Sequence, residues 1–246
     1  MSAARLPDGR TPREVLSYVR RTQRMTPSQE RAWARSADRY LVDLPDLPHT
    51  AVVAPREPLD LSAIFGREAG LVVEIGPGMG ESLVPMAAAR PEQDVLAFEV
   101  YRAGAGAIMQ KCDAAGVDNV RIVLADAASG LQHLLRPGAI DELWTFFPDP
   151  WHKLRHRKRR LVSTGFADVV ATRLRPGGLW RLATDWEDYA HGMRRVLDAH
   201  PRFVNVHGDS GGWAPRWEDR PMTRFEQRGL DAGRRVHDLT YRLGAS

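Results

Sequence analysis

An aspartate held between two prolines, Asp149, stands directly before a dense run of cations. Pro148 and Pro150 fix φ nearby and restrict the residue before each ring, so the Asp149 carboxylate is presented from a stiff turn. The cations follow within a few positions; they are Lys153, Arg155, Arg157, Lys158, Arg159 and Arg160, with His152 and His156 among them. One rigid carboxylate beside a cationic segment predicts chemistry on a polyanion at a defined point.

A buried strand must position this turn, because the apolar run Leu143 to Phe147 leads into it. Similar runs predict further strands over residues 71–75, 94–100, 120–125 and 179–184, and a terminal antiparallel pair over 203–206 and 238–243. Helices are expected between them, over residues 81–89, 103–115, 161–174 and 186–199. This alternation predicts an α/β fold with a doubly wound, mainly parallel sheet of about seven strands.

Glycines at the end of the first strand suggest a ligand site, since ligands of such sheets bind beyond the carboxyl ends of the strands. Gly76, Gly78 and Gly80 let the backbone approach a ligand, although glycine-rich turns also serve tight packing alone. The dinucleotide pattern would need a glycine where the chain has Glu81, whose carboxylate would repel a pyrophosphate. The observed order, E-x-G-x-G-x-G from Glu74, instead resembles the first motif of S-adenosylmethionine-dependent methyltransferases.

Acidic residues at three strand ends agree with that resemblance. Glu99 is placed to accept hydrogen bonds from ribose hydroxyls, Asp126 from an adenine amino group, and Glu74 faces the cationic methionine end of the cofactor. Each acid alone could instead be a helix cap or a solvated residue. The ordered set of glycines and acids favours a cofactor site.

The chain before residue 59 differs from the rest. It is rich in arginine between Arg13 and Arg39 and then punctuated by proline, and residues 1 to about 12 are expected to be disordered. Thr26, Pro27 and Glu30 predict a helix start with a capping box, and the helix should reach about Tyr40. We therefore divide the chain into a basic extension, 1–58, which either meets RNA or is simply solvated, and a catalytic domain, 59–246.

The overall composition is ordinary for a globular protein, with a formal charge of +4, a pI of about 9.6 and an apolar fraction of 43%. With one cysteine, Cys112, there is no internal disulfide and no cysteine-based zinc site. The histidines lack ligand spacing, so no metal is expected. No signal peptide or membrane-length apolar run is visible, which predicts a cytoplasmic protein.

Three segments together resemble the bacterial tRNA (guanine-N7-)-methyltransferases. They are WTFFPDPWHKLRHRKRR from Trp144, ATDW from Ala183 and PMTRFEQRG from Pro221. The resemblance extends from Val19 nearly to the C-terminus. It implies a Rossmann-like class I methyltransferase that uses S-adenosylmethionine as cofactor and tRNA as substrate, as a monomer or homodimer.

The resemblance also implies roles for individual residues. Glu74, Gly76, Gly78, Gly80, Glu99, Asp126 and Asp149 would bind the cofactor, and Asp149 would be catalytic. Substrate contacts would come from Lys153, Asp185, Thr223, Arg224, Phe225 and Glu226, and RNA contacts from Arg155, His156, Arg157, Lys158, Arg159 and Arg160. Arg224 stands where many family members have lysine, which keeps the charge but changes its geometry.

The implied reaction suits a carboxylate. Guanine N7 carries an exposed lone pair, so no proton need be removed, and positive charge develops on the base as the methyl group moves. A carboxylate about 4 Å away would stabilise that charge by roughly 4 kcal/mol at an effective dielectric constant near 20. We therefore expect Asp149 to orient and stabilise rather than act as a base, with Asp185 and Glu226 as partners for guanine N1-H and its amino group.

Two other functions compete with this one. A methyltransferase for exocyclic amino groups usually has an Asn or Asp-Pro-Pro-aromatic motif at this strand end, whereas this chain has Pro-Asp-Pro-Trp. An RNA-binding protein that kept the fold but lost catalysis would not need the complete set of acids and glycines. For Trp151, anchoring the turn is favoured over stacking on an RNA base.

Overall fold

A computed structural model describes residues 17, 24–45, 47 and 51–245. Its seven strands form one sheet in the order β3-β2-β1-β4-β5-β7-β6. The strands are β1 (Gly70–Ile75), β2 (Gln93–Phe98), β3 (Val120–Val123), β4 (Ile140–Phe146), β5 (Leu174–Thr184), β6 (Phe203–Asn205) and β7 (His237–Leu243). Strands β1 to β5 are parallel, and β7 lies antiparallel to both β5 and β6. The predicted mainly parallel sheet and its terminal antiparallel pair are confirmed.

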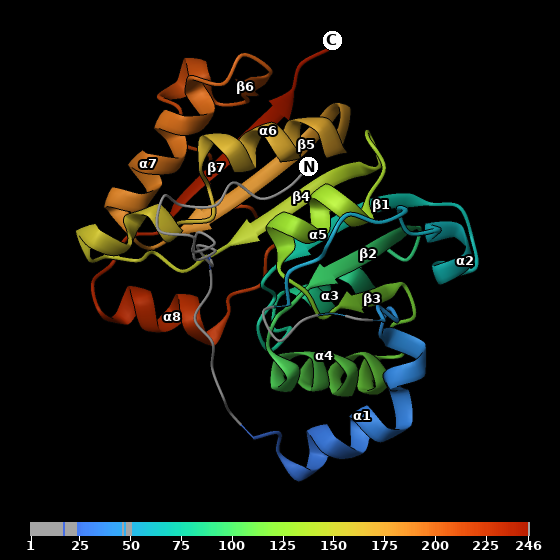
Figure 1. Ribbon diagram of the computed structural model, residues 1–246. Coiled ribbons are helices and arrows are strands. Elements are labelled where there is room, and N and C mark those ends of the chain that lie inside the picture. Colours follow the sequence, from blue (N-terminus) through green and yellow to red (C-terminus); the bar gives the residue numbers. More distant parts are fainter. Residues whose placement is uncertain (1–16, 18–23, 46, 48–50, 246) are drawn as a thin grey trace, which may run out of the picture.

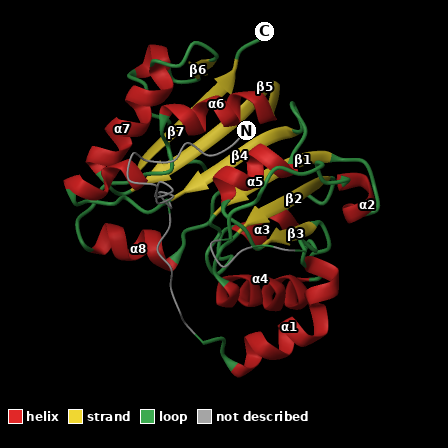
Figure 2. Ribbon diagram, in the orientation of Figure 1, coloured by secondary structure: helices red, strands yellow, loops and turns green. Residues whose placement is uncertain are grey.

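Helices cover both faces of this sheet (Figure 1, Figure 2). The elements are α1 (Pro27–Tyr40), α2 (Leu61–Phe65), α3 (Leu83–Ala88), α4 (Arg102–Ala115), α5 (Ala127–Leu134), α6 (Thr164–Arg173), α7 (Glu187–Asp198), α8 (Arg224–Asp231) and the 3-10 helices η1 (Leu154–Arg159) and η2 (Gly208–Ser210). Apolar residues of α5, α6 and α7 share one core with the sheet, and those of α1, α3 and α4 share the other.

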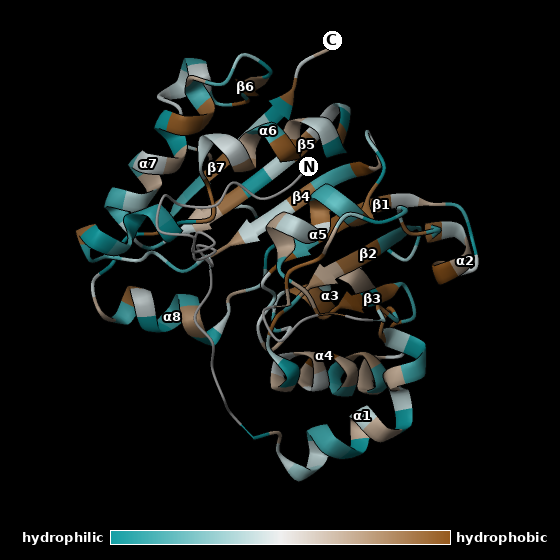
Figure 3. Ribbon diagram, viewed as in Figure 1, coloured by the Kyte–Doolittle hydropathy of each residue, from teal (hydrophilic) through white to brown (hydrophobic). Residues whose placement is uncertain are grey.

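The central strands are apolar on both faces because each face is covered by helices. Val73 belongs to the core beneath α5 and α6, while its neighbour Val72 belongs to the core beneath α3 and α4. Figure 3 accordingly shows β2 and β3 largely in the brown of apolar residues. Polar side chains therefore gather where the strands end, and the reversal of strand order between β1 and β4 opens the sheet edge there to a ligand.

The N-terminal helix packs on the domain rather than standing apart from it. Helix α1 lies along α4, and the chain then continues to Leu41, which forms a parallel bridge with Ile122 of β3. Thr26 caps the helix as expected, but the capping box is closed by Gln29 and not by Glu30, because Gln29 occupies the third helical position. The domain boundary near residue 58 stays a prediction. The expected disorder of residues 1–12 lies outside the described residues.

Two helices that carry site residues were not expected from the sequence. The run to Ala125 was predicted as strand, but β3 ends at Val123 and α5 begins at Ala127. Helix α8 begins after Thr223, whose Oγ1 accepts a hydrogen bond from the Glu226 backbone N–H at 3.1 Å. Both helices start at a side-chain cap, and the site residues lie at or beside that cap. No helix in the described ranges is long and apolar enough to cross a membrane.

Candidate active site and RNA-facing surface

The glycine loop after β1 exposes its backbone to a ligand. Gly76 and Gly78 have φ values of +67° and +59°, and a Cβ at either position would meet nothing within 4 Å. Open space above a left-handed backbone is what a closely approaching ligand requires. Gly80 serves packing instead, because its Cβ would lie 2.8 Å from Cγ1 of Ile108.

Glu99 holds this loop in place with its carboxylate. Its Oε2 accepts from the Gly78 backbone N–H at 3.0 Å, and its Oε1 accepts from the N–H groups of Val100 and Tyr101 at 2.8 and 2.9 Å. Such charge-assisted hydrogen bonds to backbone N–H groups are among the stronger ones in proteins. Buried Glu99 therefore fixes the distance between the first and second strand ends.

Gly104 of α4 lies behind the same loop and was missed by sequence reasoning. A Cβ on Gly104 would lie only 2.6 Å from the carbonyl oxygen of Gly78 and 3.4 Å from Cδ of Glu99. Helix α4 can approach the loop only because this residue is glycine. The sequence signal was a glycine inside a predicted helix, which usually has a packing reason.

Glu74 is a buried acid with an unpaired oxygen. It is 2% exposed, and its Oε1 accepts a hydrogen bond from Ser82 Oγ at 3.4 Å. Its Oε2 has no hydrogen-bond partner among the described residues. Burial raises the pKa of Glu74 to about 8. A buried carboxylate with an unpaired oxygen is suited to a cationic ligand group, which would restore its charge.

Asp126 caps α5. Its Oδ2 accepts from both the backbone N–H and the Oγ of Ser129, each at 2.9 Å. Asp126 is therefore a helix cap, which was the alternative to a cofactor contact that the sequence left open. A cap at the third strand end still faces the ligand side of the sheet, and the expected contact with an adenine amino group stays a prediction.

The turn that carries Asp149 is strained on both sides. Phe147 and Trp151 have φ values of +50° and +42°, which are unfavourable for bulky residues. The Phe147 N–H donates to the Ala183 carbonyl at 2.7 Å, and the Trp151 indole donates to the Ser17 carbonyl at 2.8 Å. Such strain persists only where surrounding structure imposes it, and it concentrates at functional sites. The stiff presentation expected for Asp149 is therefore enforced by its neighbours as well as by its prolines.

The cationic segment has two structural parts. Its inner members support the turn: Arg160 donates to the Pro150 carbonyl at 2.8 Å and pairs with Asp188 at 2.6 Å, while the Arg159 guanidinium lies 3.7 Å from the Trp151 ring centroid. The contacts of Trp151 with Ser17 and Arg159 favour its anchoring role.

The remaining members of the segment face solvent. Lys153, Arg155, Arg157 and Lys158 are exposed along η1, although Arg157 also reaches Asp188 at 3.1 Å; His156 is half-buried against the Trp151 ring. The RNA contacts expected of these exposed cations stay predictions.

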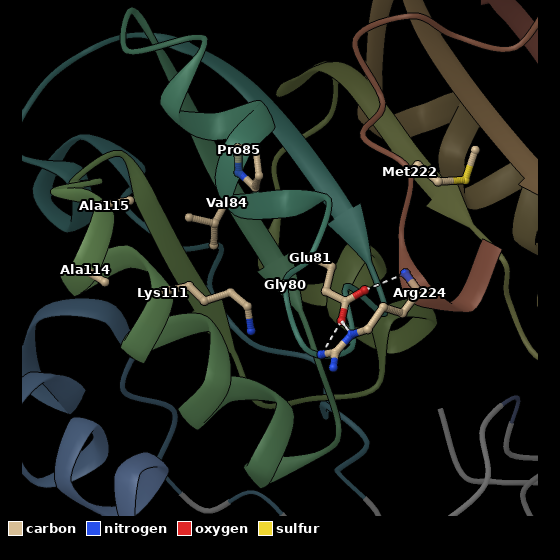
Figure 4. A pocket seen from close by; sticks show the side chains of 9 residues that line it. All are labelled: Gly80, Glu81, Val84, Pro85, Lys111, Ala114, Ala115, Met222 and Arg224. Atoms are coloured by element: carbon tan, nitrogen blue, oxygen red, sulfur yellow. Dashed lines mark hydrogen bonds and ion pairs between the residues drawn. The ribbon is translucent and has the colours of Figure 1, made fainter. Parts of the chain in front are cut away.

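The expected substrate residues lie on α8 and at the end of β5. Arg224 pairs with Glu81 at 2.5 Å and also donates its backbone N–H to that carboxylate at 2.8 Å (Figure 4). Phe225 is 53% exposed and its ring centroid lies 5.4 Å from that of Phe147. Helix α8 is thereby tied to the glycine loop on one side and to the Asp149 turn on the other.

Glu226 and Asp185 are already paired with arginines. Both Glu226 oxygens accept from Arg216, at 2.9 and 3.1 Å, and its Oε2 also accepts from Arg220 at 3.0 Å. Glu226 is fully buried. Asp185 accepts from Arg234 at 2.7 Å. Direct contacts of these two acids with guanine stay predictions, whereas the two arginines on Glu226 support a positioning role for that residue.

A pocket of about 470 Å³ lies between α3, α4 and the segment before α8 (Figure 4). Its walls are mainly apolar, and its polar members are Glu81, Lys111 and Arg224. It borders the end of the glycine loop at Gly80 and Glu81. Among the described residues there is no group of three or more His, Cys, Asp or Glu side chains that could hold a metal ion; the expected absence of a metal is a separate prediction.

Comparison with known proteins places most of the chain in one group. Residues 68–239 match a family described as "Putative methyltransferase". A tRNA (guanine-N(7)-)-methyltransferase of Cutibacterium acnes is 53% identical over 95% of this chain and 84% of the relative. One from Nocardioides sp. is 50% identical over 96% of this chain and 90% of the relative.

The sheet also resembles those of solved methyltransferases. The antibiotic-resistance methyltransferase Kmr aligns with a TM-score of 0.50 at 18% identity, over 76% of this chain and 92% of that one. The 16S rRNA methyltransferase KamB aligns with a TM-score of 0.50 at 20% identity, over 79% and 99%. These likenesses confirm the predicted Rossmann-like methyltransferase fold.

Proposed function

Because the chain belongs to the tRNA (guanine-N7-)-methyltransferase family, we propose that it methylates N7 of guanosine 46 in the variable loop of tRNA. The observation that supports this most directly is the placement of Asp149: a strained turn holds its carboxylate beside an open glycine loop and exposed cations. We expect the enzyme to work in the cytoplasm, without a metal, as a monomer or homodimer.

The cofactor is S-adenosylmethionine, which supplies an electrophilic methyl group on a sulfonium. The residues present fit it. Gly76 and Gly78 leave open space over the loop, and Glu74 offers an unpaired buried oxygen to the cationic methionine end. Glu99 and Asp126, at the next two strand ends, would take the ribose and the adenine amino group. Each of these two carboxylates already has a structural partner that fixes its orientation.

Asp149 then has to serve the acceptor base in addition to its expected contact with the cofactor. Guanine N7 attacks with its own lone pair, so the protein must orient the ring and stabilise the positive charge that it acquires. The Asp149 carboxylate does both from a fixed turn, without accepting a proton from the reacting atom. Exposed Phe225, next to Phe147, offers an aromatic face where the base would lie.

The raised pKa of Glu74 makes ligand affinity depend on pH. Between pH 4.5 and about 8 the folded protein holds Glu74 neutral while the unfolded chain ionises it, so the stability of the free protein falls as pH rises across that window. A cationic ligand group favours the ionised form, and affinity should therefore rise with pH, by up to about tenfold per unit below the folded pKa. Calorimetric titration with S-adenosylhomocysteine between about pH 6 and about pH 8.5 would measure this rise.

Glu74→Gln is the matched control, because the ligand's own amine titrates equally in both proteins. We expect the variant to show a flatter profile than the wild type. If the two profiles run parallel, Glu74 does not face the cationic end.

The salt dependence of tRNA binding should depend on the exposed cations of η1. Arg155→Ala/Lys158→Ala removes two of them, and the removal of each phosphate-binding cation should reduce the slope of log Kd against log salt by about 1. Filter-binding titrations at several salt concentrations would give the slope. Arg67→Ala/Arg175→Ala is the control pair. These arginines pair with Asp94 and Asp141, which lie at the N-terminal ends of β2 and β4, whereas Asp149 follows the C-terminal end of β4. Equal changes in both double variants would contradict the assigned RNA-facing surface.

A cellular experiment tests the proposed activity. Bulk tRNA from cells that lack this protein, digested to nucleosides and analysed by mass spectrometry, should lose 7-methylguanosine. Complementation with the wild-type chain should restore it, and failure of complementation would count against the proposal.

A further inference from the structure

Arg220 is a buried arginine that directly precedes the PMTRFEQRG segment, and its charge acts on the strand-end acid Glu74. Its side chain is 1% exposed and its guanidinium forks between two acids. One nitrogen donates to Glu226 of α8 at 3.0 Å, and another donates to both oxygens of Asp238 of β7, at 2.9 and 3.1 Å. The planar fork of arginine allows one side chain to hold two elements in a fixed relation.

The same guanidinium lies against the end of β4. Its central carbon is 5.3 Å from the Phe146 ring centroid and 5.2 Å from the Phe147 ring centroid. Phe147 is the strained residue whose left-handed φ directs the chain into Pro148 and Asp149. Aromatic faces attract a cation at this distance, and the attraction is stronger where water is excluded. Arg220 therefore contacts the residue that aims the catalytic turn.

Arg220 is also connected to Phe147 through backbone hydrogen bonds. Asp238 pairs in register with Ala183 of β5, and the Ala183 carbonyl accepts the hydrogen bond from the Phe147 N–H. Phe225 of α8 also packs against Phe147. Arg220 thus lies at the point where α8, β7 and the end of β4 meet.

We propose that Arg220 is a positioning residue for methyl transfer, which holds the acceptor-side helix α8 and the Asp149 turn in one fixed relation. The proposal rests on the proposed function. Arg220 is too buried to contact the polyanion itself. Its charge opposes the rise in the pKa of Glu74 at the end of β1, and a lysine at position 220 would keep that charge. Loss of the forked Arg220 geometry should consequently affect the alignment of the reacting groups. The binding of the cofactor and of tRNA should stay nearly intact.

Arg220→Lys is the test, because lysine keeps the charge between the two buried acids but cannot fork or lie flat on the aromatic rings. With a defined tRNA transcript, the single-turnover rate of methyl transfer should fall about ten- to 100-fold, as expected when reacting groups are slightly misplaced. The Kd values for S-adenosylhomocysteine and for tRNA should stay within about twofold of wild type. Arg216→Lys changes the other arginine that pairs with Glu226, and it should lower the rate of methyl transfer much less than Arg220→Lys does.

Two outcomes would overturn the proposal: a wild-type transfer rate in Arg220→Lys, or a parallel loss of rate and of both affinities, which a merely structural role predicts. If Arg220→Lys does not fold, Asp238→Asn decides, since it keeps Arg220 and one acceptor oxygen. It should show a smaller loss of rate with the same intact binding, and an unchanged rate would refute the role. Wild-type enzyme in the same assay reports separately on the proposed function.

Discussion

Asp149→Ala should lower the rate of methyl transfer by about two to three orders of magnitude, the usual effect of removing one preorganised electrostatic group. The carboxylate is presented by a turn with strained residues on both sides, so its position is fixed before the substrate binds. Binding of tRNA should change little, because the exposed cations on η1, and not the Asp149 carboxylate, are expected to meet the phosphates. Single-turnover kinetics and filter binding on the same tRNA would measure the two effects.

Asp149→Asn separates charge from shape. The amide keeps the size and one acceptor oxygen, but it cannot stabilise a developing cation as a carboxylate does. We expect most of the rate to be lost in this variant as well. Near wild-type turnover in Asp149→Asn would show that Asp149 only orients the substrate, and a collapse of tRNA binding in either variant would move its role to recognition.

Gly104→Ala should weaken cofactor binding although the residue touches no ligand. The new Cβ would lie 2.6 Å from the Gly78 carbonyl, closer than real Cβ atoms come, so either α4 or the glycine loop must shift. Overpacking of this kind costs about 1–3 kcal/mol. If the loop takes up the shift, the Kd for S-adenosylhomocysteine should rise about five- to 150-fold. Calorimetry on the folded variant would measure it.

Gly165→Ala is the control for that substitution. Gly165 also lies inside a helix, α6, but a Cβ there would meet nothing within 4 Å. Alanine has the higher helix propensity, so this control should bind the ligand as the wild type does and be slightly more stable. Unchanged affinity in Gly104→Ala, with the variant folded, would show that α4 rather than the loop moves.

The strands and their terminal residues were predictable because their signals are local. Short, continuous apolar runs mark a strand covered on both faces, and the acid or glycine that ends each run marks the ligand edge. Glu74, Glu99, Asp126 and Asp149 consequently lie at or just beyond the ends of the first four strands, as the sequence indicated.

Contacts between distant segments were not predictable in this way. The Arg220 fork joins Glu226 and Asp238 across separate elements, and no spacing in the sequence indicates that pairing. The cationic run also reads as one unit, yet Arg160 supports the turn while Arg155 is exposed. Only the packing decides which arginines are available to RNA.

Methylation of guanine N7 in tRNA can be tested directly with purified protein, S-adenosylmethionine and one defined tRNA transcript. The product would be digested and the modified nucleoside identified by mass spectrometry. We predict 7-methylguanosine with the wild-type protein, its loss when the guanosine at position 46 is replaced by adenosine, and a greatly reduced yield with Asp149→Ala. A methyl group found on an exocyclic amine, or no incorporation by the wild-type protein, would contradict the assignment.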